Sequence, residues 1–266
     1  MIKPNFIVIG TRRAATTWLH NCLNEHPEVF VPEAKELHFF DSGYDKGFQN
    51  YLNYFIGAKD HKAIGETTPN YLDVPECAER IHKHLCDVKL IVILRHPIQR
   101  AYSDYKLFYS HHYSSFEAAI NNNASFLNRG LYHKHLINYL TYFKKENLLV
   151  LFYEDLISDN YQFIRTVYRF LEVEDKFKPS WIDKSANATN SLYFSQHLTN
   201  LHLGWLVDII KKTPLNGIIR KLLLSKRRKN NDKIRPETRE YLIDYYLESN
   251  RKLEKLLGRN LSHWNQ

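Results

Sequence analysis

The chain contains 266 residues, with 44% hydrophobic and 25% charged side chains, which fits an ordinary globular protein large enough to bury a core. Its formal net charge of +8 favours an anionic partner, but charge alone does not choose among a nucleotide, a phosphorylated or sulfated substrate, nucleic acid and an anionic membrane surface. No stretch approaches the roughly 20 apolar residues of a membrane-spanning helix.

The cysteines and the first residues predict the compartment. Cys22, Cys77 and Cys86 are odd in number and lack metal-ligand spacing, which favours a reducing compartment. The first strand is expected to begin by Asn5, which leaves no room for a signal peptide before it. Together these features predict a cytoplasmic protein.

Apolar runs alternate with helical patterns along the first two thirds of the chain. The predicted strands are residues 5–9, 62–65, 89–94 and 148–152, and the predicted helices are residues 16–25, 75–85, 97–108 and 160–171. Beyond Pro179 the sequence shows no clear strand. It predicts a helix over 197–212, a basic run at 226–229 and a charged amphipathic helix over 236–257.

This alternation predicts an α/β fold with a central parallel sheet flanked by helices. Because ligands of such sheets bind at the carboxyl ends of the strands, residues 10–17, residues 66–68 and Arg95 are expected on one rim. No repeat or low-complexity linker divides the chain. We therefore predict one domain over residues 1–266, in which the segment beyond Pro179 forms a helical cap.

The loop from Gly10 to Thr17, GTRRAATT, joins the first strand to the first helix. Free backbone N–H groups and the positive end of the helix dipole bind phosphate at such a junction. A Walker loop would need glycine at position 15 and lysine at position 16, where this chain has Ala15 and Thr16. ATP or GTP hydrolysis is therefore disfavoured, which leaves another kind of phosphate site or a junction without a ligand.

The loop resembles the 5′-phosphosulfate-binding loop of sulfotransferases that use 3′-phosphoadenosine 5′-phosphosulfate (PAPS). Arg13 stands where that family has a lysine, and Ala15 where it has a glycine. Arginine keeps a fixed charge but cannot donate its proton, so the resemblance implies charge stabilisation by Arg13 and not general-acid catalysis. The resemblance places these residues on the 5′-phosphosulfate: Arg12, Arg13, Ala14, Ala15, Thr16, Thr17 and Trp18.

A second anion element lies in LIVILRHPIQRAYSDY, residues 90–105. This segment resembles the family's 3′-phosphate element, in which an arginine at a strand end and a serine eight residues later converge on that phosphate; here these are Arg95 and Ser103. Arg95 leaves the sheet at its carboxyl end, and Ser103 is expected early in the next helix. Read alone, Arg95 also fits a structural ion pair, but together with the loop upstream it predicts a PAPS site.

Further segments match in the same order along the chain, namely PEAKELHFFD, GETTPNYL, NRGLYHKHLINYL, LVLFYEDLI and LLGRNLSHW. Over nearly its whole length the chain thus resembles the sulfotransferases of the heparan sulfate 3-O type and their soluble bacterial relatives. The resemblance implies a P-loop-like sulfotransferase fold, PAPS as co-substrate, 3′-phosphoadenosine 5′-phosphate (PAP) as product, and no metal. It also implies that Tyr132 lies near the 3′-phosphate and that Arg227, Arg228 and Lys229 contact that phosphate and the adenine.

The resemblance assigns the catalytic residues as well. In KELHFFD, Glu36 matches the family's catalytic base, and His38 and Asp41 match further residues of the motif. Glu36, His38 and Arg13 are therefore the predicted catalytic residues, with Glu36 accepting the acceptor's proton during in-line transfer. Where relatives often carry a lysine after the glutamate of GETTPNYL, this chain has Thr67, and we expect Lys35 or Arg12 to supply the missing charge.

The sequence thus predicts a PAPS-dependent sulfotransferase that transfers a sulfuryl group to a hydroxyl or amine of a small molecule or sugar, as in natural-product tailoring. It predicts no metal, nucleic-acid or membrane partner. Two alternatives remain at this stage. A nucleotide kinase-like phosphotransferase would use ATP with Mg²⁺, and a non-enzymatic polyanion-binding protein would bind through its +8 charge with steep salt dependence.

Overall fold

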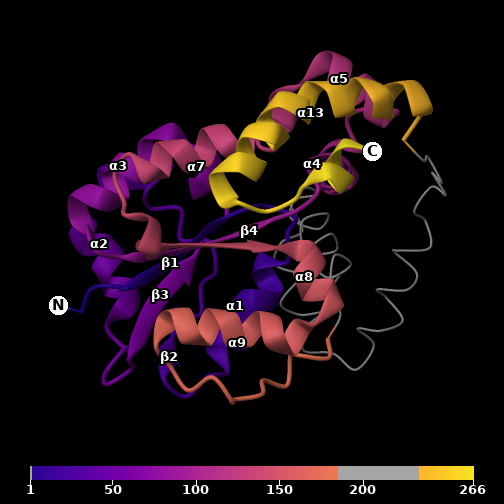
Figure 1. Cartoon of the computed structure of the whole chain (residues 1–266). Helices are drawn as coiled ribbons and strands as arrows, with labels where there is room; N and C mark the ends of the chain where they lie inside the picture. Colours follow the sequence, from indigo (N-terminus) through magenta and orange to yellow (C-terminus); the bar gives the residue numbers. More distant parts are fainter. Residues whose placement is uncertain (1, 185–233) are drawn as a thin grey trace, which may run out of the picture.

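The computed structural model describes residues 2–184 and 234–266. Its centre is a parallel sheet of five strands in the order β2-β3-β1-β4-β5. The strands are β1 (Phe6–Gly10), β2 (Val29–Phe30), β3 (Ala63–Thr67), β4 (Lys89–Leu94) and β5 (Leu148–Phe152). Helices cover both faces of the sheet (Figure 1), which confirms the predicted fold class.

β1 is apolar throughout, and β4 is apolar at every position after Lys89, because both faces of these strands are buried. On β1, Phe6 and Val8 point into one core while Ile7 and Ile9 point into the other. β4 divides its side chains between the same two cores. Successive side chains of a strand point to opposite faces, so one short apolar run packs against both helix layers.

The two layers come from different parts of the chain. One face packs against α1 (Thr16–Asn24) and α9 (Asn160–Leu171). The other packs against α3 (Pro75–His84), α7 (Tyr132–Leu140) and the end of α13 (Pro236–Leu257), as Figure 1 shows. The remaining α-helices of the described residues are α2 (Phe48–Leu52), α4 (Pro97–Asp104), α5 (Phe116–Asn122), α6 (Ser125–Asn128) and α8 (Tyr153–Ser158).

The predicted strands and most predicted helices are confirmed, with differences at their ends. The predicted strand 62–65 extends through Thr67, so Glu66 lies inside β3 and not beyond it. The helix predicted to run to residue 108 ends as an α-helix at Asp104 and continues as a π-helix over Tyr105–Tyr109. β2 has only two residues, too few for a readable apolar pattern.

The C-terminal helix follows the predicted bounds, and its side chains Leu242 and Tyr246 pack with α4, α5 and α6 in a third apolar cluster. The predicted helix 197–212 and the basic run with Arg227, Arg228 and Lys229 lie outside the described residues. The prediction of a single domain stays a prediction. Of the helices described, none is both long and apolar enough to cross a membrane.

Candidate active site

The loop between β1 and α1 leaves the N-terminus of a helix open. Ala15 precedes the helix in a left-handed conformation, with φ of 65°, and provides no side-chain hydrogen bond to the first turn. Arg13 is also left-handed, with φ of 70°. A left-handed conformation costs an L-residue about 1–2 kcal/mol, and glycine avoids this cost. This explains the glycine that the resembling sulfotransferase loops have where this chain has Ala15. The first backbone N–H groups of α1 thus retain the capacity to bind an anion.

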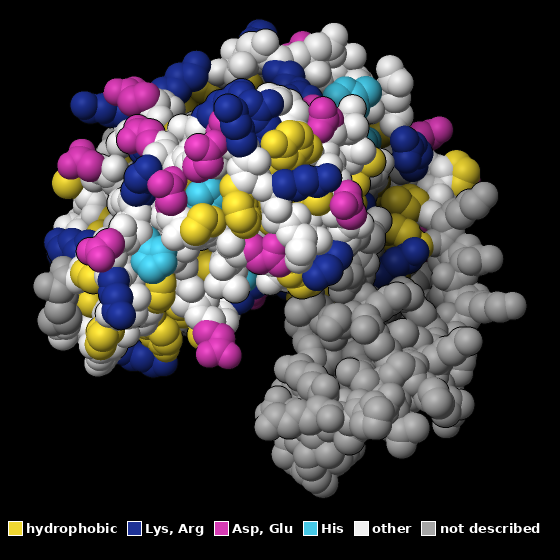
Figure 2. Space-filling model, turned by 90° about the horizontal axis from the view of Figure 1, so that it is seen from below, with side chains coloured by type: hydrophobic (Ala, Val, Ile, Leu, Met, Phe, Trp, Pro, Cys, Tyr) yellow, Lys and Arg dark blue, Asp and Glu magenta, His cyan; other side chains and the backbone are white. Residues whose placement is uncertain are grey.

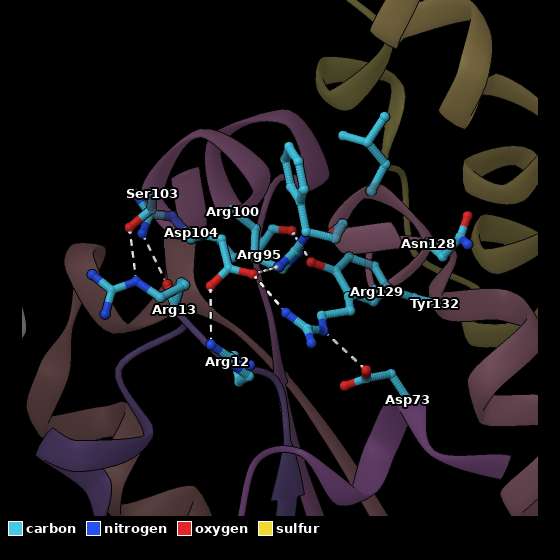
Figure 3. A network of polar contacts seen from close by, with 12 residues as sticks. Arg12, Arg13, Asp73, Arg95, Arg100, Ser103, Asp104, Asn128, Arg129 and Tyr132 are labelled. Carbon is cyan, nitrogen blue, oxygen red and sulfur yellow. Dashed lines mark hydrogen bonds and ion pairs between the residues drawn. The ribbon is translucent and has the colours of Figure 1, made fainter. Parts of the chain in front are cut away.

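The loop and the second anion element meet at Arg13. The Arg13 Nε donates a hydrogen bond to Ser103 Oγ at 3.0 Å, and Arg95 Nη1 donates to the Arg13 carbonyl oxygen at 2.9 Å (Figure 3). Tyr132 fixes the same strand end, because its hydroxyl donates to the Arg95 carbonyl oxygen at 2.8 Å. These contacts span 90 and 82 positions of the sequence and bring the two segments together at one rim of the sheet.

A buried carboxylate, Asp104 at the end of α4, holds three guanidinium groups. Asp104 Oδ2 lies 3.1 Å from both Arg100 Nη1 and Arg129 Nη1, and Asp104 Oδ1 lies 3.6 Å from Arg12 Nη2. Figure 3 shows that Arg129 turns from Asp104 toward Asp73 and donates to that carboxylate as well, at 3.0 Å. These contacts connect the phosphate loop, α4 and the segment before α7.

The arginines of this region outnumber its carboxylates. Burial lowers the pKa of Arg12 and of Arg13, and Asp104 only partly offsets this effect. Within the described part of the chain, the buried Arg95 Nε has no hydrogen-bond partner. Desolvated cations and an unpartnered donor are stabilised by a bound anion, so the region is suited to phosphate.

We expect Asp104→Asn to lower the free energy of unfolding by about 3–5 kcal/mol, because it leaves the fully buried Arg100 without its counter-charge. Urea denaturation measures the change. Asp175→Asn is the matched control, since Asp175 also pairs with two arginines, Arg165 and Arg169, but near the surface. The control should lower the free energy of unfolding by less than about 1 kcal/mol. Equal losses of stability in the two variants would show that the ion pairs of Asp104 contribute no more than those at the surface.

A cavity of about 450 Å³ opens beside the phosphate loop. Its wall carries Arg12, Arg13, Thr16, Thr17, Lys35, Glu36, His38, Pro69, Asn70, Leu107 and Phe108. Arg12 lies over the Phe108 ring, with its guanidinium carbon 4.3 Å from the ring centroid. The cavity thus brings the predicted catalytic residues of two separate segments to one space.

Glu36 is ionised in this cavity. Burial alone would raise the pKa of Glu36, but His38 and Lys35 outweigh that effect and lower the pKa to about 2. Lys35 Nζ lies 2.5 Å from Glu36 Oε1, and His38 Nε2 lies 3.7 Å from Glu36 Oε2. His38 Nδ1 lies 2.7 Å from Asp41 Oδ2, and the hydrogen bonds to Asp41 and Glu36 raise the pKa of His38 to about 9. At neutral pH the cavity therefore holds a carboxylate beside an imidazolium.

The raised pKa of His38 predicts a pH-dependent stability. The protonated form stabilises the folded chain fully below the ordinary histidine pKa of 6.5, and this contribution is lost as the pH rises through about 9. Urea unfolding of the wild type between pH 6.5 and 9 should therefore show a larger loss of stability than unfolding of His38→Asn. Parallel curves for the two proteins would contradict the assigned protonation state.

Several predicted site residues are buried in the fold. Ala14 is fully buried, and its backbone N–H donates to the Thr11 carbonyl oxygen at 3.3 Å. The Trp18 indole Nε1 donates to the Trp181 carbonyl oxygen at 3.0 Å, and neither residue lines the cavity. Tyr132 is fully buried as well. Thr67, which stands where relatives carry a lysine, is buried with its hydroxyl 3.3 Å from His20 Nδ1.

Four charged residues of this region are not predicted from the sequence: Asp73, Arg100, Asp104 and Arg129. Asp104 stands within the segment that resembles the 3′-phosphate element, and its position four residues after Arg100 is the sequence signal that could have marked it. Arg129 and Asp73 are 56 positions apart. Pairing across such a distance depends on the tertiary fold, which a single sequence does not reveal.

The chain matches the family described as Sulfotransferase domain over residues 3–202. Membrane-associated sulfotransferase kil1 of Dictyostelium discoideum is 40% identical over 105 residues, which cover 38% of this chain but only 22% of that protein. Human heparan sulfate glucosamine 3-O-sulfotransferase 5 is 26% identical over 97% of this chain and 73% of that protein.

The crystal structure of a sulfotransferase from Alicyclobacillus acidocaldarius superposes with a TM-score of 0.75 at 22% identity, with full coverage of both chains. At this identity the likeness concerns the fold. It agrees with the parallel sheet and the helix layers described above.

Proposed function

The chain belongs to the sulfotransferase domain family, and we propose that it transfers a sulfuryl group from PAPS to a hydroxyl or amine of a small acceptor. The observation that carries this proposal is the contact between Arg13 and Ser103. It joins a loop suited to a 5′-phosphate to helix α4, which follows the strand end at Arg95 and is suited with it to a second phosphate. PAPS is a nucleotide with phosphate groups at both positions.

The proposed donor site fits an anion with two phosphate groups. The first-turn N–H groups of α1, together with Arg13, Thr16 and Thr17, would hold the 5′-phosphosulfate. Arg95 and Ser103 would hold the 3′-phosphate, with Arg95 kept in place by its stacking on Tyr153, 4.5 Å from the ring centroid. The predicted contribution of Arg227, Arg228 and Lys229 remains part of the proposal.

PAPS supplies an activated sulfuryl group, and the reaction breaks the bond between sulfur and the bridging phosphate oxygen while a bond to the acceptor forms. Glu36 would take the proton from the acceptor hydroxyl or amine. Arg13 would stabilise the charge that develops on the leaving phosphate oxygen. Because the pKa of Glu36 is about 2, this carboxylate is fully ionised but weakly basic, so its contribution depends on accurate placement.

We propose that Lys35 supplies the charge that relatives obtain from the lysine at position 67. Lys35 and Arg12 both line the cavity, but Arg12 is already bound by Asp104 and stacked on Phe108. Lys35 pairs with Glu36, so its ammonium lies beside the base, where the sulfuryl group would arrive. An unchanged turnover rate in Lys35→Ala would remove Lys35 from this assignment.

The acceptor is proposed to be small. The cavity of about 450 Å³ must hold both the phosphosulfate end of the donor and the reacting part of the acceptor. Leu107, Phe108 and Pro69 add apolar surface to the charged wall of the cavity. A sugar or natural product with a reactive hydroxyl or amine fits a cavity that is lined by both charged and apolar side chains.

The two alternatives have less support. A nucleotide kinase-like phosphotransferase lacks its Walker lysine, since Thr16 stands at that position. A polyanion-binding protein would need a continuous basic surface, whereas Figure 2 shows Lys and Arg side chains interspersed with Asp and Glu on the described part of the face seen there.

Incubation with sulfur-labelled PAPS and a panel of hydroxyl and amine acceptors tests the proposal. We expect PAP release that depends on an acceptor, with the label recovered in the product. ATP with Mg²⁺ in place of PAPS should give no transfer. Phosphoryl transfer from ATP would overturn the proposal in favour of a kinase-like activity.

A further inference from the structure

Glu66 on β3 is a buried carboxyl group, 1% exposed, that no step of the proposed reaction uses. Its Oε1 accepts hydrogen bonds from the hydroxyls of Tyr51 and Tyr71, both at 3.0 Å, and its Oε2 accepts from Thr68 Oγ1 at 2.5 Å. Burial raises the pKa of Glu66 to about 7. A buried carboxyl held by neutral hydroxyls is costly to maintain, and its contacts indicate what it does.

Among the described residues, the Tyr71 hydroxyl makes a second contact, and the Tyr51 hydroxyl does not make it. Its oxygen accepts a hydrogen bond from the backbone N–H of Phe39 at 2.9 Å and lies 3.4 Å from the N–H of Phe40. Because the Tyr71 O–H donates to Glu66, the lone pairs of that oxygen are free to face these backbone groups. Glu66 therefore sets the orientation of the hydroxyl that holds the backbone directly after His38.

The other end of the same segment is held by the neighbour of Glu66. The backbone N–H of Glu36 donates to the Thr67 carbonyl oxygen at 3.0 Å. Between these two attachments, Glu36 and His38 both adopt left-handed conformations, with φ of 63° and 52°. Such conformations persist only where surrounding contacts impose them. Thr67 and the Glu66–Tyr71 pair are the contacts that bracket this strained segment.

We propose that Tyr71, oriented by the buried Glu66, is a positioning residue that fixes the backbone carrying the catalytic carboxylate Glu36. Its effect on turnover rests on the proposed sulfotransferase function, whereas its effect on the backbone does not. The pair acts on the placement of Glu36 beside the acceptor and not on donor binding.

Tyr51 provides a matched control. Tyr51→Phe and Tyr71→Phe each remove a buried hydroxyl that donates to the same oxygen of Glu66 over the same distance, but only Tyr71→Phe frees the Phe39 N–H. With PAPS and an acceptor, Tyr71→Phe should lower kcat about 10- to 100-fold and leave the KM for PAPS within about threefold. Tyr51→Phe should keep kcat within about threefold of the wild type. Equal losses of kcat in the two variants would overturn the proposal.

Two substitutions of Glu66, one conservative and one apolar, test its role. Glu66→Gln keeps an acceptor oxygen for Tyr71 and should retain most of kcat, whereas Glu66→Leu removes it and should match Tyr71→Phe. A loss in Glu66→Gln as large as that in Glu66→Leu would contradict positioning through the hydroxyl.

Hydrogen exchange measures the backbone effect without any reaction. In Tyr71→Phe the Phe39 amide should exchange at least about tenfold faster than in Tyr51→Phe, and exchange at a similar rate in both would overturn the proposal. If the wild type shows no sulfuryl transfer, the proposed function fails, and the exchange measurement still decides the role of Tyr71.

Discussion

Replacing Glu36 by glutamine is expected to lower kcat by about 10²- to 10⁴-fold, the range typical of a lost general base. Glutamine keeps the shape of the side chain and can accept a hydrogen bond from Lys35, but it cannot accept the acceptor's proton. The KM for PAPS should change little, because the donor is bound by other groups. Steady-state kinetics with PAPS and an acceptor gives both constants.

Glu248→Gln is the matched control for this change, since it removes a carboxylate that is 80% exposed on α13. The pH profile gives a second check. Because the pKa of Glu36 is about 2, wild-type kcat/KM should show no acid limb from this group between about pH 5 and 8. A Glu36→Gln enzyme with wild-type kcat would contradict the role of Glu36 as base.

The second large effect is expected at Arg13, whose guanidinium joins the two anion elements. Arg13→Ala should lower kcat/KM by about 10²- to 10³-fold, because it removes a preorganised cation at the leaving phosphate. Arg13→Lys should lose less than about tenfold, since it restores a cation where relatives carry a lysine, although it loses the planar contact from Nε to Ser103 Oγ.

Arg169→Ala removes the same charge from an exposed position on α9, where Arg169 pairs with Asp175. It should leave kcat/KM unchanged, which separates a local effect from a change in net charge. Equal losses in Arg13→Ala and Arg13→Lys would reject the assigned role of Arg13.

The sequence predicts the scaffold well where its signals are strong. The runs over β1 and β4 are apolar at nearly every position, as expected of strands that are buried on both faces, and the run over the edge strand β5 is equally apolar although its first three residues are half-buried. The Gly10 loop and the strand end at Arg95 follow from this arrangement, because parallel strands bring their carboxyl ends to one rim.

The rest depends on contacts between segments far apart in the sequence. Glu66 reads as a polar residue after a strand, but the hydroxyls of Tyr51 and Tyr71 allow it to be buried within β3. The protonated state of His38 follows from its distances to Asp41 and Glu36. Neither residue type nor spacing encodes such distances, so the sequence predicts the members of the site better than their ionisation.

Calorimetric titration with PAP, adenosine 5′-phosphate and ADP tests the central claim of a PAPS site most directly. PAP and adenosine 5′-phosphate differ only in the 3′-phosphate, and two charge-assisted contacts at about 1.5–3 kcal/mol each correspond to at least a 100-fold difference in Kd. We expect that difference in the wild type, weak binding of ADP, and a difference that shrinks toward unity in Arg95→Ala. Equal affinity of the wild type for PAP and adenosine 5′-phosphate would contradict the account.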